Sequence, residues 1–215
     1  MNLHSSKNKR ALITFEGGEG AGKTTLINHL YGSLAAEGRS VLKTRQPGGT
    51  PLGAKIRELL LTPTENPISS RAELLLFLAD RAQHVDECIV PALEKNTIVL
   101  CDRYCDSTMA YQGAARGLDP ETLEELCLFS TKGLEPDLTL YLDIEPEKGF
   151  ERVRKERGKC DRIEQETLEF HHRIRNCYLE IAEKEPHRFF ILDASCSVEE
   201  VYQTGLEIVH GFLNL

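Results

Sequence analysis

The sequence lacks an excess of positive charge and any apolar run long enough to cross a bilayer. Its 26 lysines and arginines are outnumbered by 34 aspartates and glutamates, which gives a formal net charge of −8. A general nucleic-acid-binding protein is usually basic, so nucleic acid is not an expected partner. The lack of a spanning run predicts no association with a membrane. An acidic protein that binds an anionic ligand must concentrate positive charge locally, so its arginine positions carry information.

The first ten residues also lack the apolar core of a secretory signal, because they are polar and basic. We expect residues 1–10 to form a flexible tail. Seven cysteines are scattered without a C-x-x-C pair, which predicts reduced thiols in a cytoplasmic protein. A zinc site is not expected, because the one tight pair of candidate ligands, His171 and His172, are neighbours in a helical segment and their side chains diverge.

No internal repeat, low-complexity stretch or linker interrupts the 215 residues, so we expect residues 11–215 to form a single domain. Short apolar runs alternate with longer helical stretches, which predicts an α/β fold with a five-stranded parallel sheet and helices on both faces. Ligands of such sheets bind at the carboxyl ends of the strands. The predicted strands are Ala11–Phe15, Val41–Thr44, Thr97–Cys101, Leu138–Leu142 and Phe189–Leu192. The predicted helices are Lys23–Glu37, Leu52–Leu61, Ser70–Glu94, Thr108–Ala114, Pro120–Thr131, Pro146–Arg157, Glu164–Glu185 and Val198–Phe212.

A glycine-rich segment follows the first predicted strand and precedes the first predicted helix. It matches G-x-x-x-x-G-K-[ST], the phosphate-binding loop of nucleotide-dependent enzymes, in which the lysine charges the terminal phosphates and the threonine hydroxyl is placed for Mg²⁺. The glycines let backbone amides converge on an anion at the helix N-terminus. A glycine-rich turn with an unrelated lysine is the alternative, but spacing and context favour a P-loop NTPase fold. The predicted nucleotide-binding residues are Gly17, Gly18, Glu19, Gly20, Ala21, Gly22, Lys23 and Thr24.

Charged residues follow the neighbouring predicted strands at the same edge of the sheet. Asp102 ends an apolar strand and is the expected second anchor for Mg²⁺. Arg103 comes next and can grip a second phosphoryl group; an ion pair with Asp102 is the compatible alternative. Arg45 follows the second strand and is expected to face the same crevice. Glu19 either points to solvent or orients an arginine or a Mg²⁺-bound water.

Two further segments each allow a structural and a functional interpretation. Phe77 and Arg81 lie four residues apart on one helix face, and the pattern does not decide whether they contact a base or lie in the core and on the surface. The cationic run at 152–159 is typical of a solvated helix face. Because Gly158 interrupts it soon after the fourth strand, the run also fits a mobile lid that closes arginines over a transferring phosphoryl group.

From residue 11 to the C-terminus, these motifs resemble those of bacterial thymidylate kinases. The phosphate loop alone indicates only a nucleotide-binding protein, whereas the later motifs are specific to that family. The matching stretches are F-E-G-G-E-G-A-G-K-T-T at 15–25, T-R-Q-P-G-G-T at 44–50, D-R-Y at 102–104, S-T-M-A-Y-Q-G at 107–113, P-D-L-T-L-Y-L-D at 136–143 and D-R-I-E at 161–164.

The resemblance implies a dTMP kinase that uses ATP and Mg²⁺, produces dTDP for dTTP synthesis and forms a homodimer. It implies that eight residues bind dTMP: the phosphate ligands Arg45, Arg57 and Arg103, the base-contacting residues Phe77, Arg81, Thr108 and Gln112, and the sugar-contacting residue Tyr111.

The resemblance also implies how the transferring group is neutralised. The family carries either a basic residue in the phosphate loop or arginines in a lid. This loop has Glu19 and no extra cation before its lysine, so the chain resembles the lid-arginine type, with a lid at about residues 150–162. The implied metal ligands are Thr24 and Asp102, and the implied catalytic residues are Lys23, Arg103, Glu19, Arg154 and Arg157.

One residue departs from the family pattern: Gln46 replaces the glutamate of R-E-P-G-G. If that carboxylate normally orients Arg103 or a Mg²⁺-bound water, the glutamine weakens the arrangement, and Glu16 and Glu19 are the candidates to compensate.

Two other functions stay open from the residues alone. One is a P-loop kinase that acts on a deoxynucleoside or on a different nucleoside monophosphate. The other is a nucleotide-dependent switch, which would need a guanine-reading motif such as N-K-x-D that the sequence does not contain. The pairing of Arg45 with Arg103 favours an acceptor that already bears a phosphate.

Overall fold

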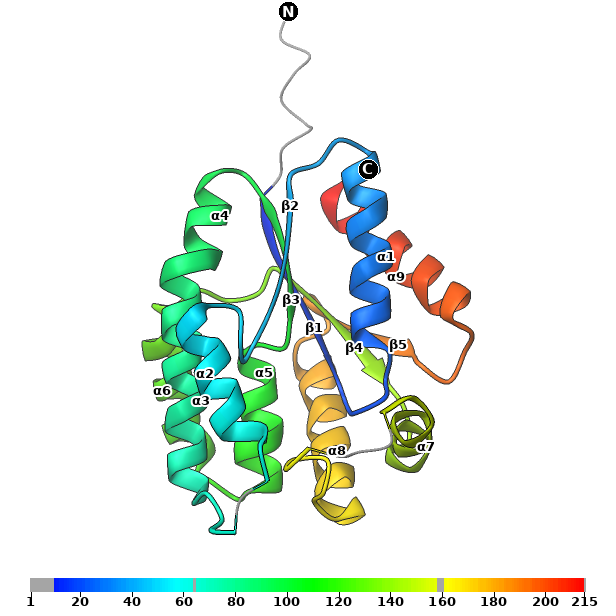
Figure 1. The fold of residues 1–215 in the computed structure, drawn as a ribbon. Helices are drawn as coiled ribbons and strands as arrows, with labels where there is room; N and C mark the ends of the chain where they lie inside the picture. Colours follow the sequence, from blue (N-terminus) through cyan, green and yellow to red (C-terminus); the bar gives the residue numbers. More distant parts are fainter. Residues whose placement is uncertain (1–9, 64, 158–160, 215) are drawn as a thin grey trace, which may run out of the picture.

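The computed structural model describes residues 10–63, 65–157 and 161–214, without the side chains of residues 156 and 157 (Figure 1). Its centre is a five-stranded sheet whose strands all run parallel, in the order β2-β3-β1-β4-β5. This confirms the predicted α/β architecture. Each strand ends one or two residues beyond its predicted bound; the strands are β1 (Ala11–Gly17), β2 (Val41–Arg45), β3 (Ile98–Asp102), β4 (Leu138–Asp143) and β5 (Phe189–Asp193).

The register of the sheet brings the polar strand ends to one edge. Asp102 at the end of β3 lies opposite Phe15 of β1 on one side and Arg45 of β2 on the other. The strands run through a core that covers both faces, and β1 is buried along its whole length. Side chains that follow the last buried residue of each strand are therefore collected at the carboxyl edge.

Two helices, α1 (Lys23–Ala36) and α9 (Val198–Leu213), cover one face of the sheet and lie side by side (Figure 1). Alternate residues of β1 point toward them, because side chains alternate across a strand. Ile13 and Phe15 share a buried cluster with Leu30 of α1 and Val209 of α9. This packing fixes the start of α1 directly beyond the end of β1.

The opposite face is covered by a longer series of helices. Leu12 of β1 and Val99 of β3 pack with Ile89 of η1 (Val85–Ile89) and Leu93 of α4 (Val90–Glu94), and Tyr141 of β4 packs with α8 (Leu168–Lys184). Helices α2 (Pro51–Leu61) and α6 (Pro120–Thr131) pack on α3 (Ser70–His84), and α7 (Pro146–Arg157) packs on α8. The prediction of helices on both faces is confirmed.

Three predicted helices differ in detail from the observed ones. The segment 70–94 contains a π-helical turn, η1, before Pro91, whose ring and missing N–H disturb regular α-helical bonding. The segment near residue 108 is α5 (Cys105–Thr108) followed by a π-helix, η2 (Met109–Ala115). The last difference is at α8, which begins at Leu168 rather than at residue 164, because Thr167 Oγ1 accepts from Phe170 N and caps the helix there.

Candidate active site

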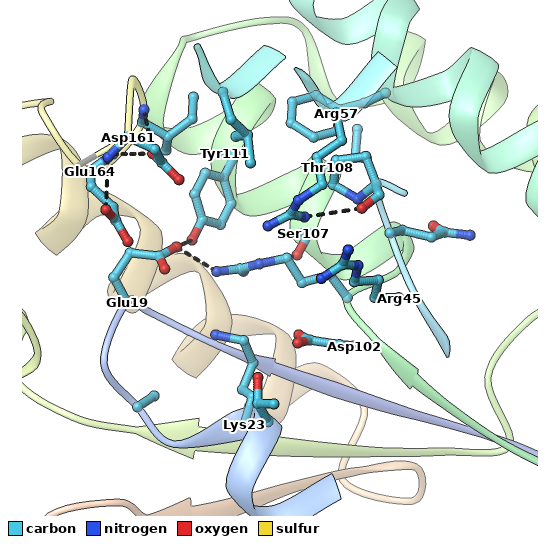
Figure 2. Close-up of a pocket in the computed structure, with 18 of the residues that line it drawn as sticks. Glu19, Lys23, Arg45, Arg57, Asp102, Ser107, Thr108, Tyr111, Asp161 and Glu164 are labelled. Carbon is cyan, nitrogen blue, oxygen red and sulfur yellow. Dashed lines mark hydrogen bonds and ion pairs between the residues drawn. The ribbon is translucent and has the colours of Figure 1, made fainter. Parts of the chain in front are cut away.

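A cavity of about 400 Å³ lies at the carboxyl edge of the sheet. Figure 2 shows side chains from the phosphate loop and from the segments after β2 and β3 around this shared space. Its wall brings together all the predicted dTMP-binding positions: Arg45, Arg57, Phe77, Arg81, Arg103, Thr108, Tyr111 and Gln112. It also includes the loop segment from Glu19 to Thr24 and the predicted metal ligand Asp102.

The phosphate loop joins β1 to the N-terminus of α1. Gly20 and Gly22 have φ angles of 67° and 91°, which residues with a side chain rarely adopt. Lys23 Nζ donates to the carbonyls of Gly17 and Gly18, at 2.9 Å each. Gly17 and Gly18 thus serve the loop by holding the lysine. The ammonium has three donors, so this anchoring leaves one for a phosphate oxygen.

Glu19 holds Arg103 over the cavity. Its Oε1 accepts from Arg103 Nη2 at 2.7 Å. It also accepts from the Tyr111 hydroxyl at 3.3 Å, as Figure 2 shows. Burial alone raises the pKa of Glu19, but the positive charges of Arg103 and Lys23 outweigh it and lower the pKa to about 2. The carboxylate is therefore ionised at neutral pH. Of the two alternatives for Glu19, orientation of an arginine is the observed one. Arg103 forms this ion pair with Glu19 rather than with Asp102, which was the alternative considered for it.

Arg103 itself sits in a strained turn that a buried carboxylate braces. Its φ is 70°, which is uncommon for a residue with a side chain. Glu16, fully buried, accepts from Tyr104 N at 2.8 Å, from Ser107 Oγ at 2.6 Å and from the Tyr178 hydroxyl at 2.8 Å. Burial and the nearby charge of Asp106 raise the pKa of Glu16. The sequence analysis named Glu16 only as a candidate to compensate for Gln46 and did not predict these partners, because they come from distant segments.

Asp102 and Thr24 both offer oxygen atoms to the cavity. Thr24 is exposed at the start of α1 and lines the cavity. Asp102 Oδ1 is buried and has no hydrogen-bond partner among the residues that the structure describes. A buried carboxylate oxygen without a partner is unfavourable unless a cation or water satisfies it. The donor set of a carboxylate and a hydroxyl is the kind that Mg²⁺ binds.

A third cation lies near Arg45 and Arg103. Arg57, from α2, donates from Nη1 to the carbonyl of Pro47 at 3.0 Å. Burial and the charge of Arg45 lower the pKa of Arg57, as expected where like charges gather. Three arginines from three separate segments thus face one space, which favours a doubly charged anion such as a phosphate monoester.

Phe77 and Arg81 both face the cavity from α3. Arg81 is almost fully buried. The sequence left open whether Arg81 lies on the surface, and that alternative is wrong. Its Nη1 donates to Thr108 Oγ1 at 2.7 Å and its Nη2 to the carbonyl of Tyr104 at 2.9 Å. Its Nε donates to Gln46 Oε1 at 2.9 Å. Gln46 therefore orients Arg81 rather than Arg103, whose orientation was one of the two roles suggested for a carboxylate at this position.

Glu73 anchors the far wall of the cavity. This carboxylate is almost fully buried and accepts from Gln112 Nε2 at 3.1 Å, from Arg116 Nε at 3.1 Å and from Arg162 Nη2 at 2.5 Å. Arg162 lies at the end of the predicted lid, which was placed at about residues 150–162. Burial by itself raises the pKa of Glu73, but the hydrogen bonds from both arginines and Gln112 hold it below its ordinary value. No sequence pattern indicated this cluster.

Next to Arg162, a compact turn faces the phosphate loop. Asp161 N donates to Glu164 Oε2, and Glu164 N donates to Asp161 Oδ1, at 2.8 and 2.9 Å. Figure 2 shows both carboxylates beside Glu19 and Tyr111. Asp161 and Glu164 line the cavity, so the D-R-I-E stretch forms part of the site rather than the start of a helix.

The structure does not place the predicted lid arginines in the cavity. Arg154 is exposed on α7 and is absent from the cavity wall. The side chain of Arg157, and residues 158–160 of the predicted lid with the hinge candidate Gly158, lie outside what the structure describes. The start of α7 does contact the phosphate loop. A Cβ on Gly149 would lie 2.2 Å from the carbonyl oxygen of Glu19, so only glycine fits that approach.

Within the described ranges, no helix has both the length and the apolar character needed to cross a membrane. This agrees with the lack of a spanning apolar run in the sequence.

Comparison with known proteins relates the chain to one family, both by its sequence and by its fold. Residues 15–204 match the family model described as "Thymidylate kinase". Among curated proteins, the thymidylate kinase of Protochlamydia amoebophila (strain UWE25) is 48% identical over 214 residues, covering 96% of this chain and 95% of that protein. The thymidylate kinase of Desulfovibrio desulfuricans is 51% identical over 207 residues, covering 94% and 95%.

A solved structure is also similar. The thymidylate kinase of Ehrlichia chaffeensis superposes with a TM-score of 0.77 at 30% sequence identity, covering 94% of this chain and 99% of that one.

Proposed function

The chain belongs to the thymidylate kinase family, and from this premise we propose how its residues divide the transfer of a phosphoryl group from ATP to dTMP. The enzyme is a dTMP kinase with the P-loop NTPase fold. The observation that carries the proposal is a cavity of about 400 Å³ that is lined both by the phosphate loop and by Arg45, Arg57 and Arg103. Such a cavity suits two nucleotides that meet phosphate to phosphate.

On the donor side, the loop from Gly17 to Thr24 holds the phosphates of ATP. Its amides point toward the anion at the positive end of α1, and the free donor of Lys23 reaches the terminal phosphates. The lysine mainly stabilises the negative charge that develops during phosphoryl transfer. In the transition state this charge is spread over the equatorial oxygens of the transferred group.

On the acceptor side, Arg45, Arg57 and Arg103 hold the phosphate of dTMP. The ion pair of Glu19 with Arg103 fixes the direction of that guanidinium, so less freedom is lost when the acceptor binds. The base lies on Phe77, with Arg81, Thr108 and Gln112 around its edge. Tyr111 lies against the sugar.

Asp102, whose Oδ1 lacks a partner among the described residues, and the hydroxyl of Thr24 would hold Mg²⁺. A bound Mg²⁺ neutralises charge on the phosphoryl group that is transferred.

Two arginines of α7 complete the proposed group of cations that neutralise the transferring phosphoryl group. Arg154, and Arg157 at the end of the helix, belong to the proposed lid segment at about residues 150–162. Support comes from the contact of α7 with the phosphate loop at Gly149, and from Arg152 Nη1, which donates to the carbonyl of Gly20 at 3.4 Å. A movement of α7 would therefore displace the loop that holds ATP through these direct contacts.

We also propose that residues 11–215 act as one domain in a cytoplasmic homodimer. Leu75 of α3 is 60% exposed, and Leu128 and Phe129 of α6 are 59% and 84% exposed. Helices α3 and α6 pack together, and large apolar side chains exposed on neighbouring helices suit contact with a second copy. The six cysteines in the described ranges are all free thiols, as expected in a reducing compartment.

A coupled assay of ADP release with each nucleoside monophosphate tests the assignment. We expect dTMP to be the preferred acceptor, with ATP and Mg²⁺ present. Release of ADP with another monophosphate but not with dTMP would overturn the substrate assignment. Release of inorganic phosphate without any acceptor would instead point to a hydrolase.

A further inference from the structure

We propose that Gln46 and His84 are positioning residues for Arg81. The side-chain amide of Gln46, turned by His84, holds the guanidinium in the orientation that leaves one donor for the base of the monophosphate. This inference rests on the proposed function, because it takes Arg81 to contact the base.

The first observation is that Arg81 is held at every nitrogen atom. Nε donates to Gln46 Oε1 at 2.9 Å, Nη1 donates to Thr108 Oγ1 at 2.7 Å and to Cys127 Sγ at 3.7 Å, and Nη2 donates to the carbonyl of Tyr104 at 2.9 Å. Within the described part of the chain, these contacts leave one N–H on Nη2. The guanidinium therefore offers the ligand a single directed donor and no acceptor.

The second observation is the orientation of the Gln46 amide. A guanidinium has no acceptor, so the atom of Gln46 that faces Arg81 Nε has to be the carbonyl oxygen. The amide NH₂ then faces His84 Nδ1 at 2.9 Å. His84 Nδ1 accepts this hydrogen bond and carries no proton. The remaining ring proton is on Nε2, which donates to Thr44 Oγ1 at 2.6 Å.

The surroundings of His84 support a neutral ring. The side chain is fully buried, and burial together with the positive charge of Arg81 lowers its pKa to about 4. A charged ring would place a second N–H against the NH₂ of Gln46. Arg81, Gln46, His84 and Thr44 thus form one chain of hydrogen bonds in which the direction of each bond is set by its neighbour.

This chain explains how the protein accommodates glutamine at position 46. A glutamate there would present an oxygen to His84 Nδ1 and would require the proton on Nδ1 instead of Nε2. The Thr44 hydroxyl can either donate or accept, so it serves both tautomers. Glutamine and glutamate at position 46 both present an acceptor oxygen to the Arg81 Nε–H donor. His84 adapts to either residue by changing its tautomer.

The consequence for the substrate concerns the edge of the base. Thymine presents a carbonyl acceptor, O4, where cytosine presents an amino donor. A guanidinium that is locked with one free N–H donates a hydrogen bond to the carbonyl of thymine and repels the amino donor of cytosine. Without the Gln46 acceptor, the guanidinium loses one of its restraints, and both the affinity for dTMP and the discrimination against dCMP fall.

Steady-state kinetics of two variants tests the proposal. Gln46→Leu has a similar size but no acceptor, and leaves a buried charged donor unpaired. We expect the KM for dTMP to rise about 10-fold or more, because a hydrogen bond to a charged group is lost. The KM for ATP stays within about 2-fold, and the preference for dTMP over dCMP falls by about the factor by which the dTMP KM rises. Gln46→Glu restores most of the dTMP affinity, because it keeps the acceptor.

A purely structural role would give a different pattern. Gln46→Leu would then lower the active fraction, so kcat would fall while both KM values stayed unchanged, and Gln46→Glu would not act as a rescue. That pattern overturns the proposal.

A spectroscopic measurement covers the case in which Gln46→Leu fails to fold. The ¹⁵N chemical shifts of the His84 ring in the unsubstituted protein at pH 7 report the tautomer. We expect the proton on Nε2, and in Gln46→Glu we expect it on Nδ1. A ring with its proton on Nδ1 in the unsubstituted protein, or a charged ring, overturns the inference. Lack of dTMP kinase activity in the unsubstituted protein would instead overturn the proposed function, since the tautomer does not depend on the substrate.

Discussion

The substitution Glu73→Gln should destabilise the enzyme strongly and weaken its binding of dTMP. Glu73 is 1% exposed and receives hydrogen bonds from Gln112, from Arg116 and from Arg162. Glutamine keeps the shape but removes the charge that both arginines share. It also turns an NH₂ group toward at least one arginine donor.

The magnitude follows from the burial of the three charges. Breaking a buried ion pair by removing one partner costs about 3–5 kcal/mol. Here the side chains of Arg116 and Arg162 keep 17% and 14% exposure, and Arg116 also pairs with Glu166 at 2.6 Å. We therefore expect a loss of about 2–3 kcal/mol at pH 7, which corresponds to a Tm lower by about 4–12 °C for a chain of this size.

The pH dependence supplies a sharper test. The folded-state pKa of Glu73 is depressed below its ordinary value of 4.5. A depressed carboxyl pKa contributes stability that is fully present above the unfolded-state pKa and is lost as the pH falls through the folded-state pKa. The difference in unfolding free energy between the two proteins should thus be constant from pH 8 to 6 and shrink below about pH 4.5.

Urea unfolding across this pH range measures the difference directly. Glu166→Gln is the matched control, because it removes a more exposed carboxylate from the same Arg116, and we expect it to cost about 1 kcal/mol or less. In the assay, Glu73→Gln should raise the KM for dTMP, since Gln112 loses its anchor. A cost below about 1 kcal/mol at pH 7, or one that does not change between pH 7 and pH 3.5, would refute the reasoning.

Three further substitutions test the proposed division of roles. Lys23→Ala should lower kcat by about 100-fold or more, because its charge acts mainly in the transition state; an unchanged kcat in the folded variant would contradict that role. Arg103→Ala should raise the KM for dTMP more than that for ATP in steady-state kinetics, and a selective defect for ATP would place this arginine on the donor side. Asp102→Asn should raise the Mg²⁺ concentration for half-maximal activity by about 10-fold or more, whereas an unaltered Mg²⁺ dependence would remove Asp102 from the metal site.

Much of the site was readable from the sequence because its signals are local. The phosphate loop lies between a strand and a helix that recur at fixed spacing, so Lys23 and Thr24 were placed by pattern alone. Asp102 and Arg45 were placed because the carboxyl ends of parallel strands meet at one edge. The collinear motifs then pointed to the acceptor residues, and the cavity wall contains those positions.

The helix boundaries show where local reasoning fails. Apolar periodicity continues through residues 70–94, so it does not reveal the π-helical turn at 85–89. The helical pattern also extends upstream of Leu168, where α8 begins. Thr167 is a capping residue in the sequence, but Ile163 lies seven residues before Phe170 and so extends the apolar face of the helix pattern. The turn before α8 forms because Asp161 and Glu164 bond each other's backbone.

What the sequence by itself determined was the fold, the phosphate loop and the family, because each depends on residue types at short, fixed spacing. What only the tertiary structure decided were the partners of the buried charges. Glu16 braces the turn at Arg103, Gln46 holds Arg81, and Glu73 joins α3 to the segment after α7. These contacts link residues that lie far apart in the chain, and a buried charge takes whichever partner the packing of the core brings within hydrogen-bond distance.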